Sequence, residues 1–149
     1  MNEANYTPLQ RIEVLLVDDD EADIKLTCRA LESDRIVNHI HMVHDGVEAL
    51  EFLRREGTFV HAPRPDIIFL DLNMPRMDGR ELLRELKTDD QFASIPVVIL
   101  TTSDAEEDID RSYAQHANSY ITKPVDLKQF KKAIQAIEQY WFSVVKLPR

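Results

Sequence analysis

Residues 67–79 read IIFLDLNMPRMDG, and this stretch decides the predicted fold. Its first four residues are apolar, and the run stops at a carboxylate, Asp71. Pro75 and Gly79 then interrupt the chain before a helical pattern begins at about Arg80. A short apolar run bounded by such residues is typical of a buried strand. We therefore expect Asp71 at the carboxyl end of a central strand, where open α/β sheets carry their functional sites.

The same order of an apolar run, a polar end and a helical pattern recurs along the chain. Strands are predicted at 12–17, 39–43, 67–70, 97–100 and 120–122, and helices at 21–34, 47–55, 80–87, 105–116 and from 126 onward. Asp20 is expected to cap the first helix, and Asp45-Gly46 to form a turn before the second. Five strand–helix units indicate an α/β fold. We predict a flavodoxin-like, doubly wound (βα)5 protein with a five-stranded parallel sheet in the order 2-1-3-4-5.

Composition and charge narrow the classes of function. The chain has 149 residues, of which 44% are hydrophobic, so we expect one domain at 11–142 between a flexible lead-in at 1–10 and a tail at 143–149. The net charge is −9, which disfavours nucleic-acid binding because phosphate contacts need a basic surface. Cys28 is the single cysteine, so no internal disulfide can form. Neither a signal peptide nor a membrane helix is visible, and a soluble cytoplasmic protein is expected.

Polar side chains that are distant in the sequence converge in the predicted sheet. Asp18 and Asp19 follow the first strand, Asp71 ends the third, Thr101 follows the fourth and Lys123 follows the fifth. Each alone has an ordinary explanation, such as a helix cap, a loop acid, a strand end or a surface lysine. Together they predict three mutually repelling carboxylates whose repulsion a Mg²⁺ ion would relieve. An aspartate can accept a phosphoryl group covalently, with the lysine and the threonine binding phosphoryl oxygens.

This set of motifs resembles that of bacterial, CheY-like response-regulator receiver domains over roughly residues 11–142. The matching runs are LLVDDD at 15–20, LDLNMPRMDG at 70–79, PVVILT at 96–101 and YITKP at 120–124. The resemblance implies that Asp71 is the phosphoacceptor of a two-component system. It also implies that Asp19, Asp71 and the backbone carbonyl of Asn73 bind Mg²⁺ directly, and that Asp18 acts through a bound water.

The resemblance further assigns the residues that would sense phosphorylation. Thr101 and Lys123 would contact the phosphoryl group, and Thr101 would move inward when the group arrives. Tyr120 would be the aromatic switch that turns into the space Thr101 leaves. Asn73 and Ser103 would flank the phosphate and tune its hydrolysis. The protein would then catalyse only its own phosphorylation and dephosphorylation, and would not be an enzyme in the usual sense.

A narrower resemblance lies in the run IEQYWFSVVKLP at 137–148, in Arg64-Pro65 and in DGRELL at 78–83. These are similar to stand-alone receivers paired with cyanobacterial phytochrome histidine kinases. A light-signalling phosphorelay partner is therefore expected, and a generic chemotaxis- or relay-type receiver with a different kinase is the alternative. We expect no attached DNA-binding domain and no membrane contact, so that output passes through other proteins or through self-association.

Self-association is predicted from apolar residues that crowd the last helical turn and the tail. One helix face cannot bury them all, and contiguous apolar surface often marks an interface. A homodimer is expected through this segment, and folding back onto the monomer is the alternative. The residues are Tyr140, Trp141, Phe142, Val144, Val145 and Leu147.

Two other functions fit the same sheet order less well. A flavin carrier needs a phosphate-binding loop rich in Gly, Ser or Thr after the first strand, whereas acidic residues 18–21 stand there. A phosphatase with an aspartate nucleophile resembles Asp-x-Asp-x-Thr, whereas the sequence at 71–75 is DLNMP. A degenerate receiver that works without phosphorylation is disfavoured because every expected side chain is present.

Overall fold

The structure is a computed structural model that describes residues 10–30, 36–72, 74, 77, 79–101 and 119–122. The elements in this part of the chain are β1 (Gln10–Val17), α1 (Glu21–Ala30), β2 (Ile36–Val43), α2 (Gly46–Arg54), the 3₁₀ turn η2 (Gly57–Phe59), β3 (Ile67–Asp71), α3 (Gly79–Thr88), β4 (Val97–Thr101) and β5 (Ser119–Thr122). The sheet has five parallel strands in the order β2-β1-β3-β4-β5. The predicted sheet is confirmed, and the helices expected at 105–116 and from 126 lie outside the described residues.

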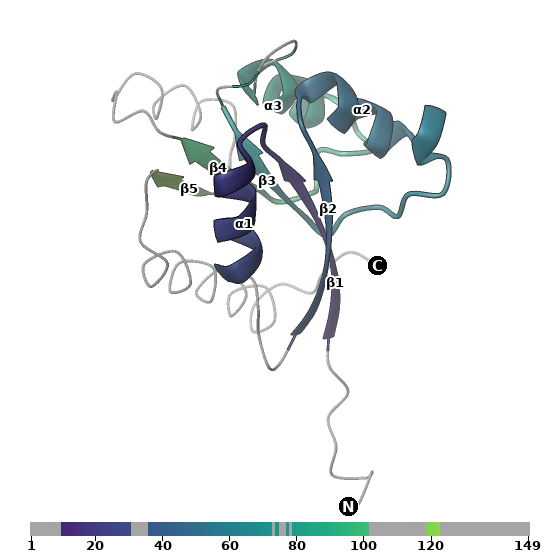
Figure 1. The fold of residues 1–149 in the computed structure, drawn as a ribbon. Coiled ribbons are helices and arrows are strands. Elements are labelled where there is room, and N and C mark those ends of the chain that lie inside the picture. Colours follow the sequence, from purple (N-terminus) through teal and green to yellow (C-terminus); the bar gives the residue numbers. More distant parts are fainter. Residues whose placement is uncertain are drawn as a thin grey trace, which may run out of the picture.

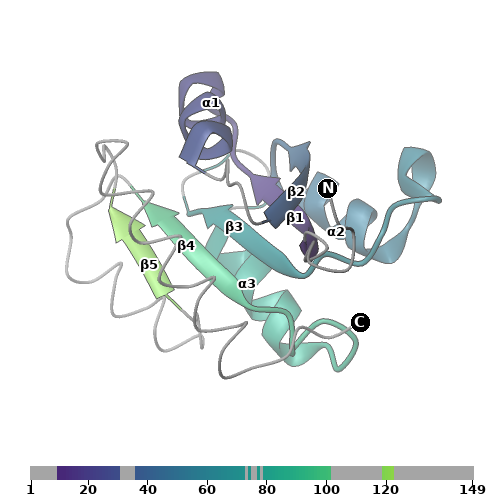
Figure 2. The same ribbon diagram turned by 90° about the horizontal axis from the view of Figure 1, so that it is seen from below.

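The described helices lie on both faces of the sheet. Figures 1 and 2 show α1 on one face, and α2 with α3 on the other. Every residue of β3 is buried, which explains its uninterrupted apolar run, because a central parallel strand is covered on both faces. None of the helices in the described ranges has the length and apolar character needed to span a bilayer.

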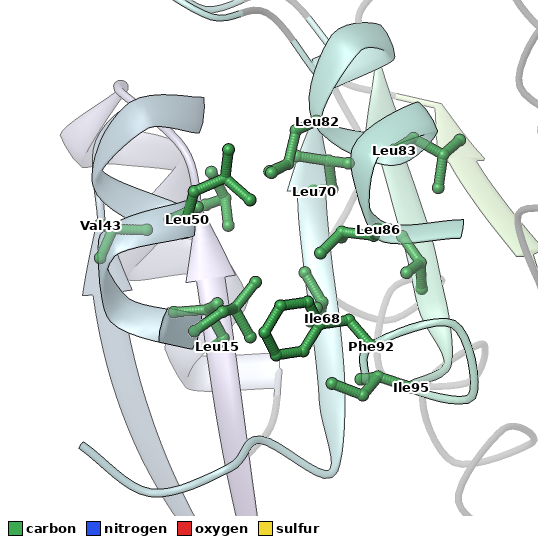
Figure 3. Close-up of a cluster of buried hydrophobic side chains, with 14 of the residues drawn as sticks. Leu15, Val43, Leu50, Ile68, Leu70, Leu82, Leu83, Leu86, Phe92 and Ile95 are labelled. Atoms are coloured by element: carbon green, nitrogen blue, oxygen red, sulfur yellow. The ribbon is translucent and has the colours of Figure 1, made fainter. Parts of the chain in front are cut away.

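The main hydrophobic core fills the space between the sheet and the α2/α3 pair. Alternate residues of each strand point into it, as the two-residue period of a strand requires. Figure 3 shows these side chains meeting between the two helices and the strands. The labelled members are Leu15, Val43, Leu50, Ile68, Leu70, Leu82, Leu83, Leu86, Phe92 and Ile95.

The edge strand β2 is longer than predicted. It begins at Ile36, three residues before the predicted start, and it pairs with β1 along its whole length, from Gln10 opposite Ile36 to Val17 opposite Val43. Gln10, which was expected in the flexible lead-in, is therefore the first residue of β1. Backbone pairing with a neighbour, rather than apolar content, sets these ends.

The turn predicted at Asp45-Gly46 is correct only in part: Asp45 is a non-helical residue before α2, whereas Gly46 already belongs to the helix. The carboxylate of Asp45 accepts a hydrogen bond of 2.8 Å from the backbone N–H of Glu48, so Asp45 is the N-cap. Gly46 is the first helical residue and Arg54 is the last. Arg55 is the C-cap and adopts a left-handed conformation with φ 57° and ψ 48°.

A half-buried lysine ties α3 to the segment that leads into β4. The Lys87 ammonium donates hydrogen bonds to the carbonyl oxygens of Ala93 (3.1 Å) and Ile95 (3.0 Å). Burial lowers the pKa of Lys87, because desolvation disfavours the charged form. The residue therefore stabilises the loop through hydrogen bonds while its charge carries a desolvation penalty.

Replacing Lys87 with methionine is expected to lower the free energy of unfolding by about 1–2 kcal/mol, because the backbone carbonyls of Ala93 and Ile95 lose their hydrogen-bond donor. Urea unfolding at neutral pH measures this, with Lys25→Met on the exposed side of α1 as the control.

The same lysine makes stability depend on pH. The pKa of Lys87 is lower in the folded state than in the unfolded state, so at pH values between the two the unfolded state binds more protons than the folded state. The wild type should gain stability in that window, and Lys87→Met should lack this gain. If Lys87→Met and Lys25→Met change the free energy of unfolding equally, the hydrogen bonds of Lys87 do not stabilise the loop.

Candidate functional site

Asp18 and Asp19 form the turn between β1 and α1. The backbone N–H of Asp18 donates to the carbonyl of Val43 (3.1 Å), which extends the pairing of β1 with β2 by one residue. The buried carboxylate of Asp18 accepts from the backbone N–H of Asp20 (2.9 Å). The carboxylate of Asp20 accepts from the backbone N–H of Ala22 (2.8 Å), so the predicted cap of α1 is confirmed. These bonds hold the turn and leave the Asp19 side chain exposed.

Asp71 is the last residue of β3, and its side chain is buried. The loop that follows is tied at both ends: Gly79 N–H donates to the carbonyl of Leu72 (3.0 Å), and Gly46 N–H donates to the carbonyl of Met77 (3.0 Å). A Cβ at Gly79 would lie 2.4 Å from the carbonyl oxygen of Asp71. The start of α3 is thus pressed against the backbone of Asp71, and α2 holds the loop from the other side.

The structure brings three carboxylates together at the carboxyl ends of β1 and β3. One oxygen from each of Asp18, Asp19 and Asp71 lies within 4.8 Å of the other two. Opposite ligands of an octahedral Mg²⁺ are about 4.2 Å apart, since each Mg–O bond is about 2.1 Å long. Two of the carboxylates are buried and one is exposed, so the group has a side open to water or to a substrate. The oxygen donors, their spacing and this open side fit a hard divalent cation.

The fourth and fifth strands end at the same rim. The register places Asp71 opposite Leu100, so Thr101 is the next residue along the adjacent strand. Thr101 in turn lies opposite Thr122 of β5, and Tyr120 lies two residues earlier on that strand. Adjacent strands are about 4.8 Å apart, so the backbone of Thr101 is a close neighbour of Asp71.

Several predicted site residues lie outside the described ranges. Lys123 directly follows the last described residue of β5, and Asn73 and Ser103 fall in gaps after β3 and β4. For Thr101 and Tyr120 the structure describes the backbone alone. The predicted roles of all five residues therefore stay predictions. The same holds for the apolar tail: Tyr140, Trp141, Phe142, Val144, Val145 and Leu147.

Comparison with known proteins identifies the family. The sequence model of the family "response regulator receiver domain" matches residues 14–135. This range contains the four runs LLVDDD, LDLNMPRMDG, PVVILT and YITKP. The chain belongs to the response regulator receiver domain family. A receiver is a signalling switch, and this receiver shares its fold and its sequence pattern with regulators that have been characterised.

Response regulator Rcp1 from Synechocystis sp. is 43% identical over 135 residues, which cover 91% of this receiver and 92% of Rcp1. The probable methanogenesis regulatory protein FilR2 from Methanothrix harundinacea is 38% identical over 136 residues, covering 91% of this chain and 86% of FilR2. The coverage of both proteins is nearly complete, so the similarity extends over whole chains and not over one shared motif.

Two solved structures superpose closely on this receiver. The phosphorylated cyanobacterial phytochrome response regulator RcpA has a TM-score of 0.83 at 45% identity, covering 93% of this chain and 99% of RcpA. The Mn²⁺-bound form of Rcp1 has a TM-score of 0.81 at 42% identity, again covering 93% and 99%. Receivers with this fold have therefore been observed both phosphorylated and with a divalent metal.

Sequence reasoning missed the part that α2 and the glycines play in the site. The sequence predicts that Gly79 only interrupts the chain before α3, yet its missing side chain lets α3 approach Asp71 and Leu72. Gly46 was placed in a turn, yet a Cβ there would lie 2.6 Å from the carbonyl oxygen of Met77. A glycine where two elements approach closely is a known signal, but one sequence does not show which elements meet.

Proposed function

We propose that this receiver accepts a phosphoryl group on Asp71 from the phosphohistidine of a sensor kinase, and that Mg²⁺ is the required ion. The observation that carries the proposal is the position of the buried Asp71 carboxylate, within 4.8 Å of Asp18 and Asp19 at the rim of the sheet. This arrangement supplies a nucleophile and a cation site at one place. The family assignment is consistent with both roles.

The transfer forms one bond and breaks one. A carboxylate oxygen of Asp71 attacks phosphorus, the N–P bond of the kinase histidine breaks, and the imidazole leaves and takes up a proton. When bound, Mg²⁺ would supply charge neutralisation for the transfer. Asp18 and Asp19 would hold the ion beside Asp71, and the tied loop after β3 keeps the nucleophile in position for in-line attack.

The output begins at the neighbouring strand. Phosphorylation adds a charge of roughly −1.5 to −2 and new acceptor oxygens at Asp71. Thr101 moves toward one of these oxygens, and Tyr120 turns into the space that is left. Support comes from the register, since Thr101 follows the residue opposite Asp71 and Tyr120 belongs to the next strand. The surface around β4 and β5 is then repacked, which changes what the protein can bind.

The kinase that fits best is of the phytochrome type. Support comes from RcpA, a cyanobacterial phytochrome response regulator that is 45% identical and covered over 99% of its length. In this role the receiver works in the cytoplasm as a light-signalling relay. It pairs with a second copy of itself through the apolar tail residues between Tyr140 and Leu147, without contacting DNA or a membrane.

Phosphotransfer profiling tests this function. Full-length protein is mixed with radiolabelled phytochrome-type and unrelated histidine kinases, with Mg²⁺ or with excess EDTA. We expect up to one equivalent of label, fastest transfer from a phytochrome-type kinase, and no transfer in EDTA. No transfer from any kinase or from acetyl phosphate would overturn the function. Faster transfer from an unrelated kinase would overturn the phytochrome pairing alone.

Asp19→Asn is expected to weaken divalent-cation binding at least roughly tenfold, because one charged ligand is replaced by a neutral one and even outer-shell changes can cost that much. Titration with Mn²⁺, followed by electron paramagnetic resonance, measures the free ion directly. Asp90→Asn, an exposed carboxylate after α3, is the matched control and should leave the affinity unchanged. Identical Mn²⁺ affinities for both variants would remove Asp19 from the metal site.

A further inference from the structure

A hollow of about 360 Å³ lies at the opposite rim of the sheet from the carboxylates. Its walls come from the C-terminal end of α2, the segment before β3 and the loop after α3. Pro65 lines it two residues before β3 begins, whereas Asp71 is the last residue of that strand. Leu53, Pro65 and Phe92 form its apolar floor. Leu53 and Phe92 are only 8% and 5% exposed, so an edge of each side chain faces the hollow. The hollow is therefore separate from the metal site.

Arginines surround this apolar floor. Arg54, Arg55 and Arg64 line the hollow, and none of the described residues that line it is acidic. Arg54 lies 3.9 Å from Glu85, but both side chains are largely exposed, and such a pair is weak. Within the described ranges the Arg55 side chain makes no ion pair. This cluster of positive charge stands out in a chain with a net charge of −9.

Arg64 is held in place by neutral groups. Its guanidinium donates to the carbonyl oxygen of Gln91 (2.5 Å) and to the hydroxyl of Ser94 (3.2 Å). These bonds fix the direction of the side chain without neutralising its charge. A guanidinium with a fixed orientation and no carboxylate partner in the described part of the chain is ready to bind an oxyanion.

The backbone of Arg55 adopts a left-handed conformation. Arg55 has φ 57° and ψ 48° at the end of α2, and its N–H donates to the carbonyl of Phe52 (3.2 Å). Glycine is the usual residue at such a left-handed helix end, because a Cβ is crowded there. Local conformation therefore favours glycine, and the arginine brings its charge to the hollow at a conformational cost.

We propose that the hollow binds a small organic phosphate monoester, with the phosphate between Arg55 and Arg64 and the organic group on the apolar floor. Two guanidinium groups that have no acidic partner among the described residues match a dianion better than a single carboxylate. The volume falls in the usual range of small-molecule sites, which begins at about 300 Å³. The floor is small because its three residues are buried, so it can contact only one edge of a compact aromatic or aliphatic group.

Phenyl phosphate is the probe, added to the full-length protein in EDTA so that the metal site cannot hold phosphate. Binding is followed by calorimetry and by backbone amide shifts. We expect saturable binding with shifts around Arg55 and Arg64.

Arg55→Gly should weaken the binding of phenyl phosphate roughly tenfold or more, since a charge-assisted hydrogen bond is lost. The same variant relieves the left-handed strain, so it should melt at the same or a higher temperature than the wild type. Arg29→Ala, at the exposed end of α1, should leave binding unchanged.

Several results would overturn the proposal. These are no saturable binding of phenyl phosphate at millimolar concentration, equal binding by the wild type and Arg55→Gly, or equal loss with Arg29→Ala. Binding of inorganic phosphate as tight as that of phenyl phosphate would refute the role of the apolar floor. Tighter binding of an unphosphorylated acidic peptide than of phenyl phosphate would refute the ligand class. None of these outcomes depends on phosphorylation of Asp71, so the two proposals fail separately.

Discussion

Asp71→Asn is expected to take up no detectable phosphate from the kinase or from acetyl phosphate. The amide has nearly the same size as the carboxylate but no charged oxygen to attack phosphorus. Loss of a catalytic nucleophile lowers rates by several powers of ten in well-studied enzymes, so we expect a loss of at least roughly a thousandfold. Gel electrophoresis that separates phosphorylated from unphosphorylated protein measures the yield.

This loss is expected without unfolding, because the substitution removes one of three mutually repelling carboxylates. Urea unfolding without added metal should give a free energy equal to or above that of the wild type. Asp90→Asn, which removes an exposed carboxylate away from the site, should be phosphorylated normally. A yield for Asp71→Asn above about one tenth of the wild type would refute Asp71 as the phosphoacceptor.

Gly79→Ala is expected to have the largest effect on stability. The added Cβ would lie 2.4 Å from the carbonyl oxygen of Asp71 and 2.6 Å from the Cα of Leu72. Both are backbone atoms, so α3 or the end of β3 must shift, and we expect a loss of about 3 kcal/mol in the free energy of unfolding. The shift displaces Asp71, so the Mn²⁺ affinity of the folded variant should also fall.

Gly57→Ala is the matched control for this substitution. Gly57 has φ +59° and no atom within 4 Å of the added Cβ, so the change tests backbone conformation without crowding. It should cost about 1 kcal/mol and leave Mn²⁺ binding unchanged. If Gly79→Ala destabilises the protein no more than Gly57→Ala does, the close approach of α3 to Asp71 is not real.

The sequence alone was enough to predict the sheet and the class of site. The runs that end at Val17, Leu70 and Leu100 are apolar because central parallel strands are buried on both faces, and this requirement leaves a local signal. The polar residues after those runs then had to share one rim, since parallel strands of one sheet end together. The sequence therefore predicts that Asp18, Asp19 and Asp71 form one group.

The ends of strands and helices were harder to predict from the sequence, because they depend on the segments that pack or pair beside them. Ile36 joins β2 since Gln10 offers it a partner, and nothing in the apolar pattern marks that pairing. Asp45 and Gly46 read equally well as a turn or as a helix start. The hydrogen bond from the Glu48 N–H to the Asp45 carboxylate shows that Asp45 caps a helix that starts at Gly46.

What the sequence determined by itself is therefore the order of the elements and the residues that end them, because burial and capping act over a few neighbouring residues. Tertiary structure alone decided the contacts between distant loops. These include the placing of three carboxylates within 4.8 Å of one another, the close approach of Gly79 to Asp71, and the presence of Arg55 and Arg64 on the walls of one hollow. The physical reason is that such contacts depend on the register between strands and on how α2 and α3 pack on the sheet, and neither leaves a periodic trace along a single chain.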